Sequence, residues 1–177
     1  MIVEGWLPRA VAARPEGVAL QTPHGNLSYA ELLACASAGA DELAARGAAP
    51  GQRVAIALPP GLAFAQALHA CLLLGAVAVP VDPRLLPAER EAIVAGAVVL
   101  VEEPLPARLP GDARGADPVR LGGGPMSTEA HPSGSTGADR YAGARHDLAA
   151  TAVVIHTSGT TSAPWRPMAR QLSTSSS

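Results

Sequence analysis

The stretch RVAIALPPGLAFAQALHACLLLGAVAVPVDP, which runs from Arg53 to Pro83, decides the fold. It contains two short apolar runs, residues 53–58 and 77–81, on either side of a longer apolar segment, residues 62–74, with proline or glycine at each break. Parallel strands that are buried on both faces read as continuous apolar runs, and a crossover helix joins them. The stretch therefore predicts a strand–helix–strand unit.

A second, weaker unit of the same kind follows directly. Pro87 is suited to a helix start, residues 88–95 have a helical pattern, and residues 97–101 form another apolar run after Gly96. Two consecutive units of this kind predict an α/β fold with a partial doubly wound sheet built from βαβ units.

The residues that precede these units are expected to form a short helix, a hairpin and a long helix. The short helix covers residues 7–13, and a strand at residues 18–22 leads into turn chemistry. Ser28 and Glu31 have the spacing of a capping box, in which each side chain accepts a hydrogen bond from the other residue's backbone. We therefore expect the long helix at residues 28–46.

The chain divides by composition into four expected segments. Residues 1–101 form an α/β N-terminal subdomain, and residues 102–147, rich in Pro, Gly and Ala, form a flexible loop. Order is expected to return in residues 148–165, where an apolar strand at 149–156 leads into a polar loop. Residues 166–177 are expected to be a disordered tail.

Composition and charge exclude several classes of function. The formal net charge is −2 and the arginines form no basic stripe, so we expect no nucleic-acid partner. Residues 62–81 are long enough to span a bilayer, but Gln66 and His69 lie inside them and Gly75 interrupts them, so a buried helix and strand is the better reading and no membrane is expected. The absence of a visible signal peptide predicts a cytoplasmic location.

Neither a metal site nor a catalytic group is expected. Cys35 and Cys71 lie in apolar helical patterns without metal-ligand spacing, which predicts small buried hydrophobic residues. No carboxylate pair or nucleophile–base spacing is present. Asp82, at the end of a predicted strand, is interpreted as a turn-forming residue in preference to a base.

The candidate ligand site is a run of hydroxyl residues around one glycine, placed directly after the predicted strand: Thr157, Ser158, Gly159, Thr160 and Thr161. A glycine lets backbone N–H groups approach an anion closely, and the neighbouring hydroxyls can donate hydrogen bonds to phosphate oxygens. Such clusters are more often plain surface turns. The ordered motifs in the rest of the chain favour the phosphate-binding interpretation.

Four motifs resemble, in order and spacing, those of the adenylate-forming (AMP-binding) superfamily of acyl-CoA synthetases, peptide-synthetase adenylation domains and luciferases. They are LSYAEL from Leu27, PGQRVAIAL from Pro50, LGAVAVPVDPR from Leu74 and HTSGTT from His156. Among the branches of the family, the chain looks most like the 2-succinylbenzoate-CoA ligases of menaquinone synthesis. The resemblance extends to about residue 164 and implies the N-terminal portion of the family's large α/β domain.

The resemblance also implies a chemistry. In the family a small-molecule carboxylic acid attacks the α-phosphate of ATP, with Mg²⁺ expected, to give acyl-AMP, and a thiol such as CoA then displaces AMP. The loop that matches residues 157–161 holds the phosphates that leave. Here the family's next glycine is Ser162 and its loop lysine is Trp165, so we expect weaker phosphate affinity, with Arg166 an imperfect substitute.

The family's adenine pocket, acyl pocket and C-terminal lysine have no counterpart here. We therefore expect the N-terminal part of an AMP-forming acyl-CoA ligase, truncated and inactive by itself. The alternative is a non-catalytic module that binds a nucleotide or a partner. A partial sheet exposes strand edges, so self-association through an exposed edge is a further expectation.

Overall fold

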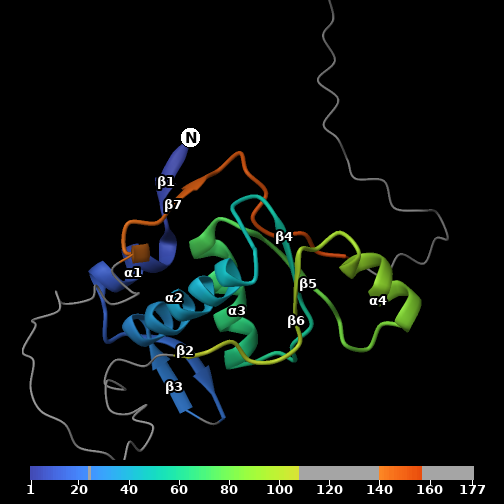
Figure 1. The fold of residues 1–177 in the computed structure, drawn as a ribbon. Coiled ribbons are helices and arrows are strands. Elements are labelled where there is room, and N and C mark those ends of the chain that lie inside the picture. The colour runs from blue at the N-terminus through green and yellow to red at the C-terminus, as the bar shows by residue number, and fades with distance from the viewer. Residues whose placement is uncertain (24, 108–139, 157–177) are drawn as a thin grey trace, which may run out of the picture.

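The computed structural model describes residues 1–23, 25–107 and 140–156, and shows a small parallel sheet with helices on both sides (Figure 1). The helices are α1 (Trp6–Ala13), α2 (Tyr29–Ala45), α3 (Leu62–Leu74) and α4 (Pro87–Val94). The strands are β1 (Ile2–Glu4), β2 (Val18–Thr22), β3 (Gly25–Ser28), β4 (Arg53–Ile56), β5 (Val77–Pro80), β6 (Val99–Val101) and β7 (Arg145–Asp147). The expected α/β class is confirmed.

The central sheet has the strand order β5-β4-β6, and all three strands are parallel. The connection from β4 to β5 runs through α3, and the connection from β5 back across β4 to β6 runs through α4. Because parallel crossovers are right-handed, two connections that move in opposite directions place their helices on opposite faces. Figure 1 shows α4 on the other side of the strands from α2 and α3. This is the doubly wound arrangement that the sequence predicted.

The two faces of the sheet are covered differently. One face belongs to the main core: Val54 and Ile56 of β4 pack in one cluster with the buried residues of α2 and α3. The opposite face carries Ala55 and Val79, which are also buried, but α4 has no fully buried residue of its own. The sheet is therefore anchored mainly from the α2–α3 side.

The long helix α2 begins where the capping box predicted. The Ser28 hydroxyl accepts a hydrogen bond from the Glu31 N–H (3.2 Å), and the Glu31 carboxylate accepts one from the Ser28 N–H (2.8 Å). The carboxylate also accepts from the Ser28 hydroxyl (3.0 Å), and the bonds that it accepts from the Ser28 N–H and hydroxyl lower the pKa of Glu31. Two of the N–H groups that have no partner within the helix are thereby satisfied.

Helices α2 and α3 approach each other closely because small residues line their contact. A Cβ atom added to Gly39 of α2 would lie 3.1 Å from the Ala70 Cβ of α3 and 3.2 Å from Leu105 Cδ1. Beside this contact the buried Gln66 side chain donates hydrogen bonds from Nε2 to the carbonyls of Cys35 (3.1 Å) and Pro106 (2.7 Å). Gln66 thus joins α3 both to α2 and to the chain that follows β6.

Three rings pack where α1 meets α2 and α3. Trp6 of α1 makes edge-on contacts with Tyr29 (6.5 Å between ring centroids) and with His69 of α3 (4.9 Å). Burial lowers the pKa of His69 from 6.5 to about 4, and its Nδ1 atom is buried without a hydrogen-bond partner. His69 is therefore neutral at pH 7 and acts as a packing residue.

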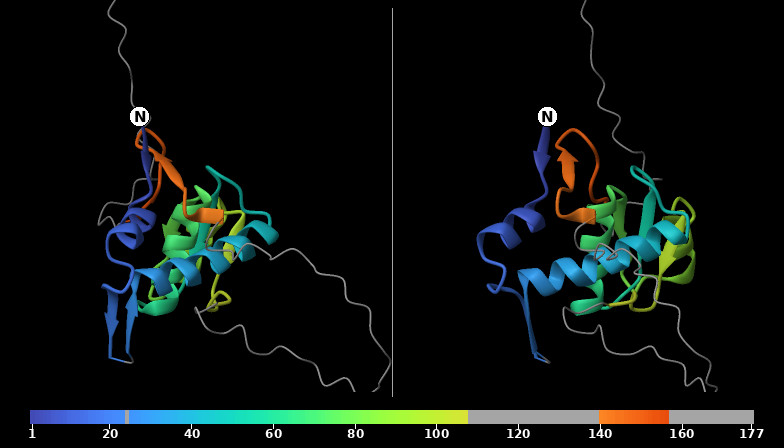
Figure 2. Two further views of the ribbon diagram at one scale, coloured as in Figure 1. Left: turned by 90° about the vertical axis from the view of Figure 1, so that its left-hand side faces the viewer. Right: turned by 60° about the vertical axis from the view of Figure 1, so that its left-hand side comes forward.

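The N-terminal strand β1 and its partner β7 were not predicted. They lie side by side and pair antiparallel (Figure 2), with Val3 opposite His146. The Met1 ammonium lies 3.3 Å from the Asp147 carboxylate. Strand β7 falls inside residues 102–147, which the sequence indicated as a loop. It was missed because three residues carry too little hydropathy pattern to be recognised as a strand. The division into four segments stays a prediction, and residues 108–139 and 166–177 lie outside the described part of the chain.

The other elements follow the sequence with shorter bounds. The β2–β3 hairpin is antiparallel, as expected, and β3 begins within the predicted turn, at Gly25. Strands β4 and β5 end before their apolar runs do, and Leu58 and Val81 are buried although they belong to no strand. Strand β6 begins two residues inside its run, and Val98 ahead of it is exposed. In β4 and β5 the apolar run thus reports burial, which extends beyond the paired residues.

Replacement of Gly39 by valine is expected to destabilise the fold by about 2 kcal/mol, because the added atoms have no room between α2 and α3. Chemical denaturation measures the loss. The matched control is Ala38→Val on the same helix, where the side chain is only partly buried and the expected change is below about 0.5 kcal/mol. Equal losses in the two variants would contradict the close-packing account.

Acidification is expected to weaken the fold through His69. The unfolded chain takes up a proton on this residue near pH 6.5, whereas the folded chain does so only near pH 4, so the stability that a neutral His69 preserves is lost as pH falls through this window. The loss is on the order of 3 kcal/mol. His69→Phe keeps a ring against Trp6 and cannot titrate, so its unfolding free energy should fall less between pH 7 and pH 4. Identical pH profiles for the two proteins would contradict this prediction.

Candidate functional site

The parallel strands all end at one side of the sheet, which we call its carboxyl edge. The connections that follow β4 and β5 diverge there. After β4 the chain turns at Pro59, Pro60 and Gly61 into α3 on one face, whereas after β5 it leaves toward α4 on the other face. Adjacent parallel strands whose connections leave to opposite faces open a crevice at their carboxyl ends, and ligands of α/β sheets bind there. The topology therefore places the candidate site at the ends of β4 and β5.

Residues 151–156 run alongside β5 in the parallel direction, toward this same edge. The Ala78 N–H donates to the Ala152 carbonyl (2.9 Å), and the Val154 N–H donates to the Ala78 carbonyl (2.9 Å). Only Val153 forms a bridge, with Ala78, so the continuous strand predicted at residues 149–156 was wrong. The segment nevertheless lies where a fourth parallel strand would lie.

The pairing between residues 151–156 and β5 is short because Pro80 limits it at one end and a turn at Asp147 limits it at the other. In parallel pairing every second residue faces the same neighbour, so Pro80 is the next residue of β5 that faces this segment after Ala78. Pro80 has no N–H group to donate. On the other side, Asp147 ends β7 in a turn, in which its carboxylate accepts from the Ala149 N–H (3.0 Å) and its carbonyl accepts from the Ala150 N–H (2.9 Å). Only a few residues of this segment therefore lie between the turn at Asp147 and the point where it would face Pro80 of β5, and these are the ones that can pair.

The predicted phosphate-binding residues follow directly on this segment. Thr157, Ser158, Gly159, Thr160 and Thr161 lie outside the described residues, so their role remains a prediction. The last described residue before them is His156, and Ile155 next to it is largely exposed, at 70%. The described chain thus leads to the motif along β5, in the direction of the carboxyl edge.

Two ion pairs lie where the chain leaves β5 and β6. The Asp82 carboxylate accepts from the Arg84 backbone N–H (2.9 Å) and guanidinium (2.7 Å), and these bonds lower its pKa to about 2. This is the turn role that the sequence indicated for Asp82. Arg90 of α4 pairs with Glu102, which follows β6. The first pair is local to the turn after β5, and the second joins α4 to the chain that follows β6.

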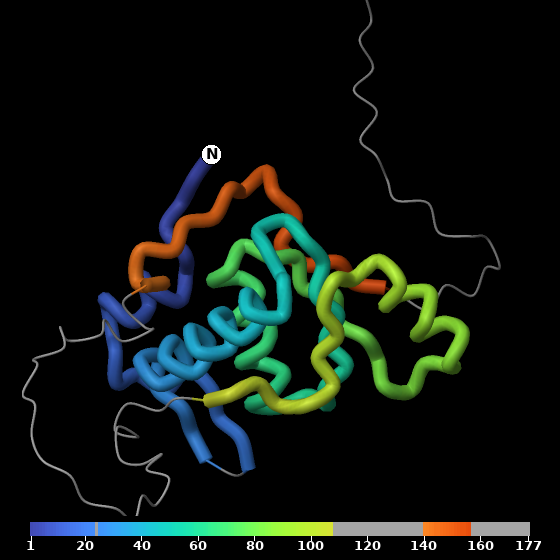
Figure 3. Tube along the Cα trace, viewed as in Figure 1, coloured from blue at the N-terminus to red at the C-terminus, as the bar shows by residue number. Residues whose placement is uncertain are grey.

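The described chain that leads to residues 151–156 begins at Arg140, and its first two residues are held on α2. Arg140 Nη1 (2.9 Å) and the Tyr141 hydroxyl (3.1 Å) both donate to the same oxygen, Oδ1, of Asp41. Burial, and then the hydrogen bond to Asp41, raise the pKa of Tyr141, so the hydroxyl keeps its proton. Sequence reasoning missed this contact, because nothing local relates residues so far apart in the chain. Figure 3 shows residues 140–156 passing from beside α1 and β1 to the sheet.

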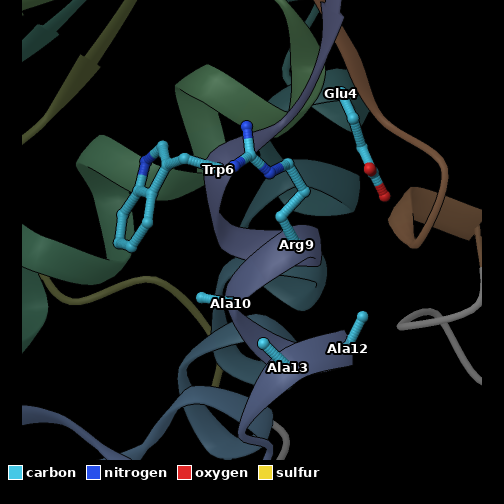
Figure 4. A pocket seen from close by; sticks show the side chains of 6 residues that line it. All are labelled: Glu4, Trp6, Arg9, Ala10, Ala12 and Ala13. Atoms are coloured by element: carbon cyan, nitrogen blue, oxygen red, sulfur yellow. The ribbon is translucent and has the colours of Figure 1, made fainter.

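A shallow hollow on α1 is not a second candidate. Its lining residues are Glu4, Trp6, Arg9, Ala10, Ala12 and Ala13 (Figure 4). Four of the six are alanine or tryptophan side chains that offer little hydrogen bonding, and none belongs to the carboxyl edge. Ligand sites need a few convergent polar groups in an apolar cleft, which this surface does not provide.

Further observations concern the groups that could carry other chemistry. Cys35 and Cys71 are both buried, as the sequence predicted, and burial raises the pKa of the Cys71 thiol to about 12. Among residues 1–23, 25–107 and 140–156, no three His, Cys, Asp or Glu side chains gather as metal ligands would. No helix in the described part of the chain has both the length and the apolar character needed to cross a bilayer.

Comparison with known proteins identifies the family. Residues 7–165 match the family described as AMP-binding enzyme. The chain is 32% identical over 163 residues to the pyochelin synthetase PchF of Pseudomonas aeruginosa (strain UCBPP-PA14), covering 92% of this chain and 8% of that protein. It is 35% identical over 85 residues to the 2-succinylbenzoate–CoA ligase of Bacillus subtilis, covering 48% of this chain and 18% of that protein. The chain therefore spans a small part of the length of these curated relatives.

Solved structures agree with the fold. The O-succinylbenzoate coenzyme A synthetase (MenE) of Bacillus subtilis, in complex with AMP, matches with a TM-score of 0.54 and 31% identity over 56% of this chain and 27% of that one. The N-terminal domain of FACL13 from Mycobacterium tuberculosis matches with a TM-score of 0.52 and 33% identity over 55% of this chain and 26% of that one. The expected likeness to 2-succinylbenzoate-CoA ligases is confirmed. The chain belongs to the AMP-binding enzyme family, and its described fold corresponds to the N-terminal portion of an adenylate-forming enzyme's large domain.

Proposed function

We propose that this chain holds the phosphates of ATP in an AMP-forming acid–thiol ligase, through Thr157, Ser158, Gly159, Thr160 and Thr161. The observation that carries the proposal is the parallel placement of residues 151–156 beside β5. It directs the chain that enters the hydroxyl-rich motif toward the carboxyl edge, where α/β sheets bind ligands. Structures of the Bacillus subtilis MenE with AMP, and with ATP and magnesium ion, support ATP with Mg²⁺ as the ligand.

The reaction proposed for the complete ligase has two steps. A carboxylate oxygen attacks the α-phosphorus of ATP, the bond to the β-phosphate bridging oxygen breaks, and acyl-AMP and pyrophosphate form. A thiol, such as that of CoA, then attacks the acyl carbon and releases AMP. Backbone N–H and hydroxyl donors around Gly159 would stabilise the negative charge that accumulates on the departing pyrophosphate.

The proposal for the acyl substrate follows the relatives. A MenE structure contains the acyl-adenylate intermediate OSB-AMP, so a small carboxylic acid is the proposed substrate class, with 2-succinylbenzoate and menaquinone synthesis as the specific case. The match to pyochelin synthetase covers more of the chain, and peptide-synthetase adenylation domains belong to the same superfamily. We place the activity in the cytoplasm, where ATP and CoA are available.

The match to MenE in the AMP complex covers 56% of this chain and only 27% of the MenE chain. We therefore propose that this chain binds Mg-ATP but does not by itself complete acyl transfer. ATP–pyrophosphate exchange with 2-succinylbenzoate should be undetectable, and exchange above background would contradict this part of the proposal.

We also propose that the chain self-associates through the edge strand β6. Velocity sedimentation tests this, and a sample that sediments only as a monomer would contradict it.

The affinity for Mg-ATP should rise when the family's lysine is restored. Trp165→Lys places a positive charge within the motif region, and one added contact between an ammonium group and phosphate is expected to strengthen binding roughly fivefold. Isothermal titration with Mg-ATP measures the change. Ala12→Lys is the matched control, since it adds the same charge on α1, away from the carboxyl edge.

The opposite change tests the glycine. Gly159→Val should abolish measurable binding, because a β-branched side chain blocks the approach of backbone N–H groups to phosphate. If Trp165→Lys and Ala12→Lys strengthen binding equally, or Gly159→Val leaves it intact, the motif is not the phosphate site. Binding to a nucleotide without dependence on this motif would instead support the non-catalytic module.

A further inference from the structure

We infer that Asp41 of α2 is a positioning residue for residues 151–156, which lead into the proposed phosphate-binding motif, and that it acts by fixing the start of residues 140–156. The inference rests on the function proposed above, because it concerns the chain that delivers the motif. Asp41 lies far from the carboxyl edge in sequence, and its role would be to hold that chain on a rigid helix.

The contact has the form of a two-donor clamp. One carboxylate oxygen of Asp41 accepts both the Arg140 guanidinium (2.9 Å) and the Tyr141 hydroxyl (3.1 Å). The Tyr141 ring also packs against the main core, together with Ala144. A bond from a guanidinium and a bond from a half-buried hydroxyl fix both the position and the direction of the chain at residue 141.

Beyond Tyr141, β1 and its neighbours hold residues 144–148 by backbone hydrogen bonds. The Gly5 N–H donates to the Ala144 carbonyl (2.8 Å), β1 pairs with β7, and the Leu148 N–H donates to the Met1 carbonyl (3.0 Å). Space beside Gly5 is limited, since an added Cβ would lie 3.0 Å from His146 Nε2. The segment therefore has one defined path from α2 to the turn at Asp147 (Figure 3).

The far end of the segment is held much more weakly. Two hydrogen bonds to Ala78 are the backbone contacts described between residues 151–156 and β5, since Pro80 cannot extend the ladder. A chain that is weakly held at one end takes its position from the end that is firmly held. The position of residues 151–156 is therefore set by Asp41 and β1 as much as by the sheet.

A general effect on stability is the competing explanation. The pair is exposed, with 40% of the Asp41 side chain and 70% of the Arg140 side chain accessible to solvent. Exposed ion pairs contribute little to folding. Loss of the contact should thus change the placement of the segment more than the stability of the fold.

The test is a charge exchange on the full chain: Asp41→Arg, Arg140→Asp and the double variant. The matched control is a second exchange on the same helix, at Glu42 and Arg46, which form a pair at 2.8 Å within the C-terminal part of α2 and the cap that follows it. Its variants are Glu42→Arg, Arg46→Glu and the double exchange. Isothermal titration gives the dissociation constant for Mg-ATP. Hydrogen exchange at the Val154 amide reports directly on the segment, without ligand.

The single Asp41 and Arg140 variants should bind Mg-ATP roughly fivefold more weakly and exchange the Val154 amide faster, with little change in thermal midpoint. The double variant should recover both properties, and the control exchange should alter neither. Unchanged exchange at Val154, or equal effects in the control exchange, would overturn the inference. If the Asp41 and Arg140 variants exchange the Val154 amide faster than the wild type, but the wild type binds no Mg-ATP, positioning stands and the proposed function fails.

Discussion

The close approach of α2 and α3 is the constraint on which the rest of the structure depends. Gly39 has no side chain where Ala70 and Leu105 lie, and Gln66 bonds across the same place to the Cys35 and Pro106 carbonyls. With only 3% aromatic residues, the core gains its contacts from many small aliphatic side chains at short range. A pair of helices packed in this way forms a stable surface against which a three-stranded sheet can be held.

The candidate site follows from how the sheet sits on that surface. After β5 the chain returns across β4 to reach β6, so the connection after β4 and the connection after β5 leave to opposite faces of the sheet. These two connections separate at the carboxyl edge. The segment after β7 reaches the same edge from the other end of the molecule, guided by Asp41, β1 and a single bridge to β5. The sheet and this segment thus come together beside β5, immediately before the hydroxyl-rich motif in the sequence.

Local patterns predicted most of the elements, and long-range contacts accounted for what they missed. The capping box at Ser28, the apolar runs of β4 and β5 and the burial of Cys35 and Cys71 depend on neighbours in sequence, and all were confirmed. Strands β1 and β7 are short and pair across almost the whole described chain, so no periodicity reveals them. The strand expected at residues 149–156 has the right composition, but its pairing depends on Pro80, which lies in another strand. The motif itself was read from residue types alone and stays a prediction.

The most direct measurement is a nuclear magnetic resonance titration of the isotopically labelled chain with Mg-ATP, with assigned backbone amides. The account requires the largest shift changes at Thr157, Ser158, Gly159, Thr160 and Thr161, with smaller ones at residues 151–156 beside β5. Shift changes centred on the α1 hollow, or none at saturating ligand, would contradict it.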